Sequence, residues 1–178
     1  MNKPNQNAKL NLSFLWLMIT IVCVVITYYC VKVKATNNYK TILHTAAESC
    51  SLEVVKFIVE NIVDVNNTQI SDFTVLHNAA DVGCLKVVKF LLEKGANINT
   101  TGRYGGTALH YAAGESHLEV VRFLLQNGAN PNIRANDGRN PRDVAVARSR
   151  HNKDKPYDEI ISLLYNAEKQ VQSDAAKP

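Results

Sequence analysis

The 178-residue chain has few of the residues from which catalytic and metal centres are built. It contains four cysteines and five histidines, and these residues do not have the spacing of a zinc motif. The sequence also lacks a Gly-x-Ser-x-Gly elbow, a His-Glu-x-x-His segment and a phosphate-binding loop with its lysine. We therefore expect no catalytic residue, no cofactor, no metal ion and no small-molecule substrate.

Charge is also modest, with 20 basic and 16 acidic residues giving a net charge of +4. A balance of this size does not by itself indicate nucleic-acid binding, which requires basic residues gathered on one face. Apart from one apolar stretch, the composition is that of an ordinary globular protein, with 46% hydrophobic and 20% charged residues.

The apolar stretch runs from Leu12 to Val31 and contains no charged residue, glycine or proline. Twenty residues in a helix span about 30 Å, the thickness of a bilayer core. The pattern predicts a single transmembrane helix over residues 12–31, behind a polar flank over residues 1–11. This interpretation implies a single-pass membrane protein.

An alternative interpretation is a long signal sequence that is cleaved near Ala35, which would release a secreted protein. The apolar stretch is longer than the usual core of a signal peptide, and Tyr28 and Tyr29 lie where an interfacial aromatic belt would be. These features favour an uncleaved anchor. The flanking lysines favour a cytosolic C-terminal side only slightly; they are Lys3 and Lys9 before the stretch, and Lys32, Lys34 and Lys40 after it.

The rest of the chain contains an internal repeat with a constant period of about 33 residues. The segments TILHTAA, TVLHNAA and TALHYAA begin at Thr41, Thr74 and Thr107, which are equally spaced. Each is followed at the same offset by an amphipathic stretch, of which LKVVKFLLE from Leu85 is an example. A fourth, altered unit opens at Asn140, with a lengthened connection between its two helices.

These segments resemble the ankyrin repeat, whose unit carries a Thr-Pro-Leu-His-x-Ala-Ala segment and a Gly-Ala-x-x-Asn exit. The resemblance implies an all-α repeat solenoid of helix-turn-helix units joined by β-hairpin loops, preceded here by the transmembrane helix. We expect the ankyrin repeat domain over residues 38–168 and a disordered tail over residues 169–178. The four repeats are expected at 38–70, 71–103, 104–136 and 137–168.

A structural role is expected for the threonine and histidine of each repeat. In the family, the threonine caps the first helix and the histidine bonds to it and to nearby backbone. Equivalent histidines in stacked repeats lie about 8 to 10 Å apart, which is too far for them to share a zinc ion. The residues concerned are Thr41, His44, Thr74, His77, Thr107 and His110.

Cys50 and Cys84 fall on the turns between the two helices of successive repeats. If a whole repeat separates them, their Cα atoms exceed the limit of about 7 Å for a disulfide. We therefore expect both to be reduced thiols.

The resemblance implies a protein-protein interaction module that binds along the surface of hairpin loops and first helices. Aromatic residues and arginine carry much of the binding energy at interfaces. The partner-contact candidates are Arg103, Tyr104, Tyr111, Glu115, Asn78, Asp81, Arg134 and Asn136.

A different possibility is that the basic fourth repeat binds anionic lipid or nucleic acid. Between residues 134 and 155 there are seven basic and three acidic residues. Such a cluster is usually a solvated cap, so nucleic acid is not the expected partner.

Overall fold

The computed structural model describes Met18 and residues 20–26, 38–66, 70, 73–152 and 156–175. The contacts divide the chain into two units, Met1–Tyr39 and Lys40–Pro178. In the first unit, residues 20–26 are helical with exposed side chains. Most of the predicted membrane helix (12–31) and all of the predicted flank (1–11) lie outside the described residues.

No helix within the described part of the chain has the length and apolar character needed to cross a bilayer.

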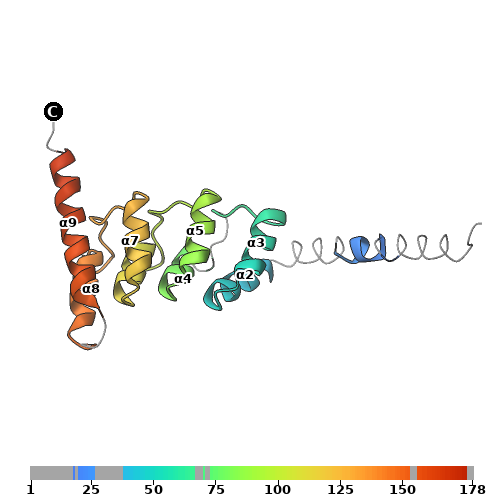
Figure 1. Ribbon diagram of the computed structural model, residues 1–178, viewed down its shortest axis with the longest axis horizontal. Helices are drawn as coiled ribbons and strands as arrows, with labels where there is room; N and C mark the ends of the chain where they lie inside the picture. Colours follow the sequence, from blue (N-terminus) through green and yellow to red (C-terminus); the bar gives the residue numbers. More distant parts are fainter. Residues whose placement is uncertain are drawn as a thin grey trace, which may run out of the picture. The chain divides into compact units, whose positions relative to one another are not determined.

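The second unit is a row of helix pairs, which confirms the predicted all-α repeat architecture (Figure 1). Alanines of the first helices, such as Ala47, Ala80 and Ala113, are fully buried, so successive first helices can approach closely. The helices are α2 (Asn38–Glu48), α3 (Leu52–Asn61), α4 (Val75–Asp81), α5 (Leu85–Glu93), α6 (Ala108–Gly114), α7 (Leu118–Gln126), α8 (Pro141–Ser149) and α9 (Tyr157–Ala175).

The loops between repeats fold back as expected, but the described residues contain no regular strand. An isolated antiparallel bridge joins Ile70 and Phe73. In the next loop, the Gly102 N–H donates to the Gly106 carbonyl at 2.8 Å. Each of these loops is therefore closed by a few backbone hydrogen bonds, two of which join Ile70 and Phe73, and the predicted β-hairpin is present only in this reduced form.

Asparagine side chains connect each loop to the following one. Asn66 accepts a hydrogen bond from the backbone N–H of Asn97 at 2.9 Å and donates to the Gly95 carbonyl at 3.0 Å. The same two bonds recur one repeat later, from Asn99 to the equivalent backbone groups of the following loop. The exit segments of the repeats thus form a ladder in the direction in which the repeats stack.

Cys50 and Cys84 form a disulfide, with their Cα atoms 5.5 Å apart. The prediction of two reduced thiols is wrong. It assumed that a full repeat spacing separates the residues, whereas Cys84 lies one position beyond the place equivalent to Cys50. One residue advances the chain by about 3.8 Å, and the buried Cys84 side chain reaches back to the preceding turn.

The prediction for Thr41 is also wrong, because this threonine does not cap a helix. Helix α2 begins at Asn38, which places Thr41 inside it with an exposed side chain. The His44 Nδ1 lies 3.1 Å from the Asn78 Oδ1 of the next repeat. Relative to the threonine of the repeat, the first helix of the first repeat therefore begins earlier than the first helix of the second repeat.

The fourth repeat differs from the prediction at its end. Asn140 caps α8 by accepting from the Asp143 N–H at 2.8 Å, with Pro141 in the first turn. Helix α9, however, continues to Ala175, so the tail predicted to be disordered from residue 169 is mostly helical. Residues 169–175 include good helix formers and contain no glycine or proline, which allows the helix to continue.

Candidate functional site

The first helices of the second and third repeats are connected to their threonine caps by histidine side chains. The Thr74 N–H donates to His77 Nδ1 at 3.0 Å, and the Thr107 N–H donates to His110 Nδ1 at the same distance. Each ring then reaches the next loop through Nε2, which lies 3.1 Å from the Thr100 carbonyl in the case of His77. These bonds connect a first helix to the loop of the following repeat.

Both imidazoles are buried and neutral. Burial lowers the pKa of His77 to about 4 and lowers the pKa of His110 in the same direction. With Nδ1 accepting a backbone hydrogen bond, the proton resides on Nε2. His77 and His110 are therefore part of the scaffold that positions the loops.

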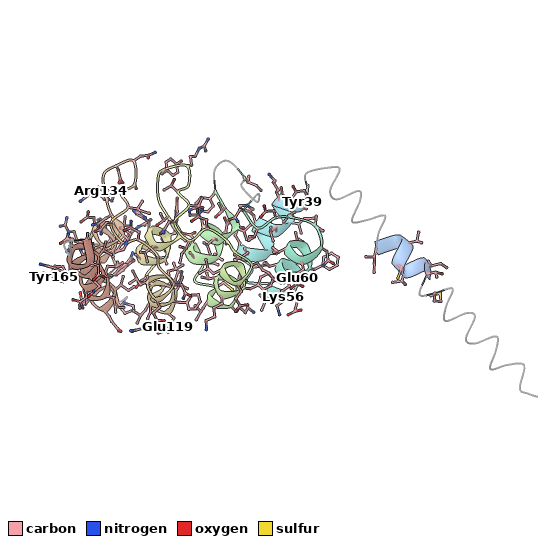
Figure 2. All side chains as sticks on the ribbon, turned by 90° about the horizontal axis from the view of Figure 1, so that it is seen from above. Tyr39, Lys56, Glu60, Glu119, Arg134 and Tyr165 are labelled. Atoms are coloured by element: carbon pink, nitrogen blue, oxygen red, sulfur yellow. A yellow bond between two sulfur atoms is a disulfide. The ribbon has the colours of Figure 1, made fainter. Side chains whose placement is uncertain are left out.

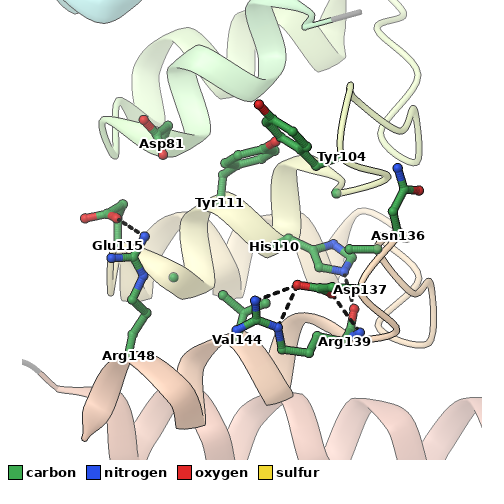
Figure 3. A pocket seen from close by; sticks show the side chains of 13 residues that line it. Asp81, Tyr104, His110, Tyr111, Glu115, Asn136, Asp137, Arg139, Val144 and Arg148 are labelled. Carbon is green, nitrogen blue, oxygen red and sulfur yellow. Dashed lines mark hydrogen bonds and ion pairs between the residues drawn. The ribbon is translucent and has the colours of Figure 1, made fainter. Parts of the chain in front are cut away.

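These loops and helices enclose a pocket of about 440 Å³, which we call the tyrosine pocket (Figure 3). Its walls come from α4, α6, α8 and the loops that precede α6 and α8. The described lining residues are Asp81, Tyr104, Gly106, His110, Tyr111, Gly114, Glu115, Ala135, Asn136, Asp137, Arg139, Val144 and Arg148.

Tyr104 is held at the rim by a tight turn that requires glycine at the next position. Gly105 has φ +74, and a Cβ there would lie 2.8 Å from the Asn136 backbone nitrogen, so only glycine fits. The Asn136 N–H donates to the Tyr104 carbonyl at 2.9 Å, which joins the two loops. The Tyr104 side chain remains 68% exposed, so its position is fixed by backbone contacts and its ring is accessible.

Tyr111 projects from α6 and forms the inner wall. Its ring packs edge-on against Phe73, with centroids 4.9 Å apart, and against His77 at 5.5 Å. Burial raises the pKa of the Tyr111 hydroxyl, and the Asp81 carboxylate adds to this effect. Tyr111 thus has a packing role as well as an exposed edge.

The charged groups of the tyrosine pocket differ in how they are paired. Asp137 forms a short ion pair with Arg139, at 2.5 Å. Glu115 and Arg148 are only 3.6 Å apart and substantially exposed. The Asp81 carboxylate makes no hydrogen bond or ion pair with any residue that the structure describes, and burial, followed by the nearby Glu115, raises the pKa of this carboxyl group.

A second pocket of about 610 Å³ adjoins the first and shares Asp81 with it. It lies over α2 and α4, and Glu48 is its other described acidic residue. Asn78 lines it, but the Asn78 amide donates to Glu48 at 2.6 Å and its oxygen faces His44. The polar groups of Asn78 in this pocket are therefore already engaged within the protein.

The structure brings five of the eight partner-contact candidates into the tyrosine pocket. Asn78 lies in the adjoining pocket, and Arg103 lies on an exposed loop outside both. Arg134 lies on the loop side of the array, opposite Glu119 (Figure 2), and donates to the Gly138 carbonyl at 2.6 Å. The five that line the tyrosine pocket are Asp81, Tyr104, Tyr111, Glu115 and Asn136.

Sequence reasoning missed the contribution of the fourth repeat to this pocket. Val144 and Arg148 lie one full period after Tyr111 and Glu115, so the repeat spacing could have identified them. The signal is weak because the fourth repeat departs from the Thr-x-Leu-His motif of the other repeats, and its charged residues are typical of a terminal cap.

Most of the basic cluster of the fourth repeat is neutralised. Four of its five described arginines form ion pairs with carboxylates, at distances of 2.5 to 3.7 Å. Arg142 pairs with Glu168 of α9 at 3.3 Å, and the other oxygen of Glu168 accepts from the Asn140 amide at 3.1 Å. The arginines of the cluster thus contribute mainly to the packing of the cap.

Within the described residues, no group of three or more histidine, cysteine, aspartate or glutamate side chains is placed to hold a metal ion.

A family model described as "Ankyrin repeats (3 copies)" matches residues 18–102, 43–135 and 99–174. A comparison with curated proteins finds no match. Because the family matches together extend over most of the sequence, the chain belongs to the ankyrin repeat family.

Proposed function

We propose that this protein is a non-enzymatic binding module that holds a protein partner in the tyrosine pocket. Ankyrin repeats suggest protein-protein interaction. The observation that supports this location is the combination of an exposed Tyr104 ring with a pocket of about 440 Å³ formed by three successive repeats. Interface hot spots are enriched in tyrosine and arginine at concave, partly desolvated positions.

Site-specific photocrosslinking in cells that produce the protein tests this proposal. A benzophenone amino acid replaces Tyr104 in one variant and Glu119 in another. Glu119 lies on α7, on the side of the array opposite the loops (Figure 2). We expect a protein adduct from position 104 that is absent from position 119.

Tyr104→Ala should then weaken capture of the same partner without changing the melting temperature, because the Tyr104 side chain is mostly exposed. The expected loss exceeds about 1 kcal/mol of binding free energy. Tyr111→Ala is a poorer test than the sequence suggests, since the Tyr111 ring packs on Phe73 and His77. Adducts from position 119 alone, or unchanged capture by Tyr104→Ala, would reject the location.

Binding of anionic lipid or nucleic acid by the fourth repeat is less well supported. Its described arginines are mostly ion-paired, which removes much of the free positive charge that such binding requires. A salt-dependent retention of the full chain on anionic vesicles would restore this alternative.

We also propose that residues 12–31 tether the array to a membrane, on the basis of their length and lack of charge. The full-length protein with a C-terminal tag should remain in carbonate-washed membranes at its full mass. Release with a new N-terminus near Thr36 would instead support a secreted binder produced by cleavage near Ala35.

The Cys50–Cys84 disulfide suggests which side of the membrane the array faces. Disulfides persist mainly in oxidising compartments and are rare in the cytosol. We therefore favour a non-cytosolic array over the cytosolic placement expected from the flanking lysines. In intact cells, a membrane-permeant thiol reagent should leave both cysteines unlabelled until a reductant is added. Immediate labelling of both cysteines would instead support a cytosolic array.

A further inference from the structure

The tyrosine pocket and its neighbour are acidic, although the chain as a whole has a net charge of +4. The lining of the tyrosine pocket contains three carboxylates and two arginines. The adjoining pocket adds Glu48 and, among its described lining residues, neither lysine nor arginine. A partner that complements this surface carries positive charge.

Asp81 is the centre of this negative surface. It lines both pockets, and its carboxylate has no hydrogen-bond or ion-pair partner among the described residues. Its carboxylate is partly buried, and Glu115 is close enough to repel it electrostatically. A cation placed between Asp81 and Glu115 relieves this repulsion and supplies hydrogen-bond donors to the Asp81 carboxylate.

The aromatic walls lie next to these carboxylates. Figure 3 shows the Tyr104 and Tyr111 rings beside one another, and Asp81 and Glu115 on the same side of the pocket as Tyr111. A guanidinium group can stack on an aromatic face while its five N–H groups donate to carboxylates in the same plane. An ammonium group has no flat face and fewer donors, so the arrangement favours arginine.

We infer that the tyrosine pocket receives an arginine side chain of a partner peptide, with the guanidinium against Tyr104 and Tyr111 and its N–H groups donating to Asp81 and Glu115. This inference rests on the proposed protein-binding function and specifies the chemistry of the partner. The pocket volume of about 440 Å³ exceeds that of one side chain, so the flanking peptide backbone also enters it.

Arg148 provides a variant that is expected to strengthen binding, whereas the other variants are expected to weaken it or leave it unchanged. It already lies 3.6 Å from Glu115 and competes with an incoming cation for that carboxylate. Its removal makes the pocket more negative, so Arg148→Gln should strengthen binding of an arginine peptide. A general loss of folding would weaken binding in every variant, and therefore cannot imitate this gain.

The experiment is a selection from a displayed random-peptide library against the full-length protein, in detergent where its apolar segment requires it. Selected peptides are then synthesised, and their dissociation constants are measured by fluorescence anisotropy. The variants are Asp81→Asn, Arg148→Gln, Tyr104→Ala and the matched control Glu119→Gln, which removes one exposed carboxylate on α7. Each peptide is also made with its basic residue replaced by glutamine.

We expect selected peptides to share an arginine at one position. Asp81→Asn should weaken their binding at least tenfold, Arg148→Gln should tighten it about threefold, and Glu119→Gln should leave it within twofold. Replacing the shared arginine by glutamine should abolish the response to Asp81→Asn.

Selected peptides without a shared basic residue that are still weakened by Tyr104→Ala would overturn the inference about arginine and leave the proposed binding face standing. Peptides that respond to neither Tyr104→Ala nor Asp81→Asn would overturn both, as would a library that yields no binder. A shared lysine with equal or tighter binding than arginine would overturn the choice of guanidinium.

Discussion

Two junctions between repeats can be compared: the first joins repeats one and two, and the second joins repeats two and three. At each, the interhelix turn of one repeat contacts the residue that begins the second helix of the next, but the side chains differ. At the first junction, Cys50 in the interhelix turn is bonded to Cys84 at the start of the following second helix. At the second, Gly83 and His117 occupy the equivalent positions. The His117 ring covers Gly83, and its Nε2 lies 2.7 Å from the Asp81 carbonyl.

The two turns require the same backbone conformation. Cys50 has φ +55 and Gly83 has φ +73, both in the left-handed region. At Gly83 a Cβ would overlap the His117 ring, whereas the Cβ of Cys50 carries the sulfur that forms the link to Cys84. The comparison shows that the residue across the junction decides whether the turn can hold a side chain.

The first-helix layer differs in the same way between the two junctions. At the first, Asn78 bridges to His44 and Glu48 through its amide. At the second, the equivalent Tyr111 packs by its ring edge and leaves one side open to the tyrosine pocket. The junction closed by a disulfide and polar bonds is structural, and the candidate binding site lies where neither occurs.

Loss of the disulfide should have the largest effect on this comparison. The variant Cys50→Ala/Cys84→Ala should lower the free energy of unfolding by about 3–4 kcal/mol, as expected for a covalent loop of this length. Repeat arrays open locally, so amide exchange should increase most in α2 and α3. Adding a reductant should reproduce the effect in the native protein and do nothing to the double variant.

Acid should loosen the second junction. The pKa of His77 is about 4 in the fold and about 6.5 in an unfolded chain. Between these values the unfolded state binds a proton that the folded state does not, so the free energy of unfolding falls as pH decreases from 6.5 towards 4. The total loss is at most about 3.5 kcal/mol, at about 1.4 kcal/mol for each unit of pKa shift.

The imidazole NMR signals of His77 report this titration directly, and denaturant unfolding at pH 7 and pH 5 reports its effect on stability. The pH 5 point lies above the usual range of carboxyl titration. His77→Gln keeps a polar side chain and should reduce the pH dependence over this interval, leaving the part contributed by His110, whose pKa burial also lowers. A His77 signal that titrates near pH 6.5 would contradict a buried neutral ring.

Gly83→Ala should destabilise the protein by about 2 kcal/mol, because the new Cβ adds contact with His117 to an unfavourable φ. Gly95→Ala is the matched control, since Gly95 has φ +84 but no atom within 4 Å of a built Cβ. It should lose about 1 kcal/mol. In a double-mutant cycle, adding His117→Ala should reduce the loss of unfolding free energy caused by Gly83→Ala to about the loss caused by Gly95→Ala.

Much of the fold follows from the constant period of the sequence, because helix spacing and stacking repeat with it. Details of the junctions do not, since they depend on side chains one position away from equivalence. Cys84 reaches Cys50 for this reason, and the pairing could not be found from the repeat spacing alone. Likewise, Asp81 and Glu115 were recognisable as exposed positions, but their proximity to Arg148 depends on how the altered fourth repeat packs.

The asparagine ladder gives the smallest expected effect, and it is the feature that both junctions share. Asn66→Ala and Asn99→Ala each remove an acceptor and a donor to the next loop. These bonds are exposed, so each variant should lose about 1 kcal/mol of unfolding free energy. Asn132 is the equivalent residue one repeat later, and no hydrogen bond of its side chain is present among the described residues, which makes Asn132→Ala the control.

Equal losses for Asn66→Ala and Asn99→Ala, with none for Asn132→Ala, would show that the junctions differ in their turns and first helices but not in their loops. A larger loss at Asn66 than at Asn99 would mean that the irregular first repeat depends on its loop as well as on its disulfide.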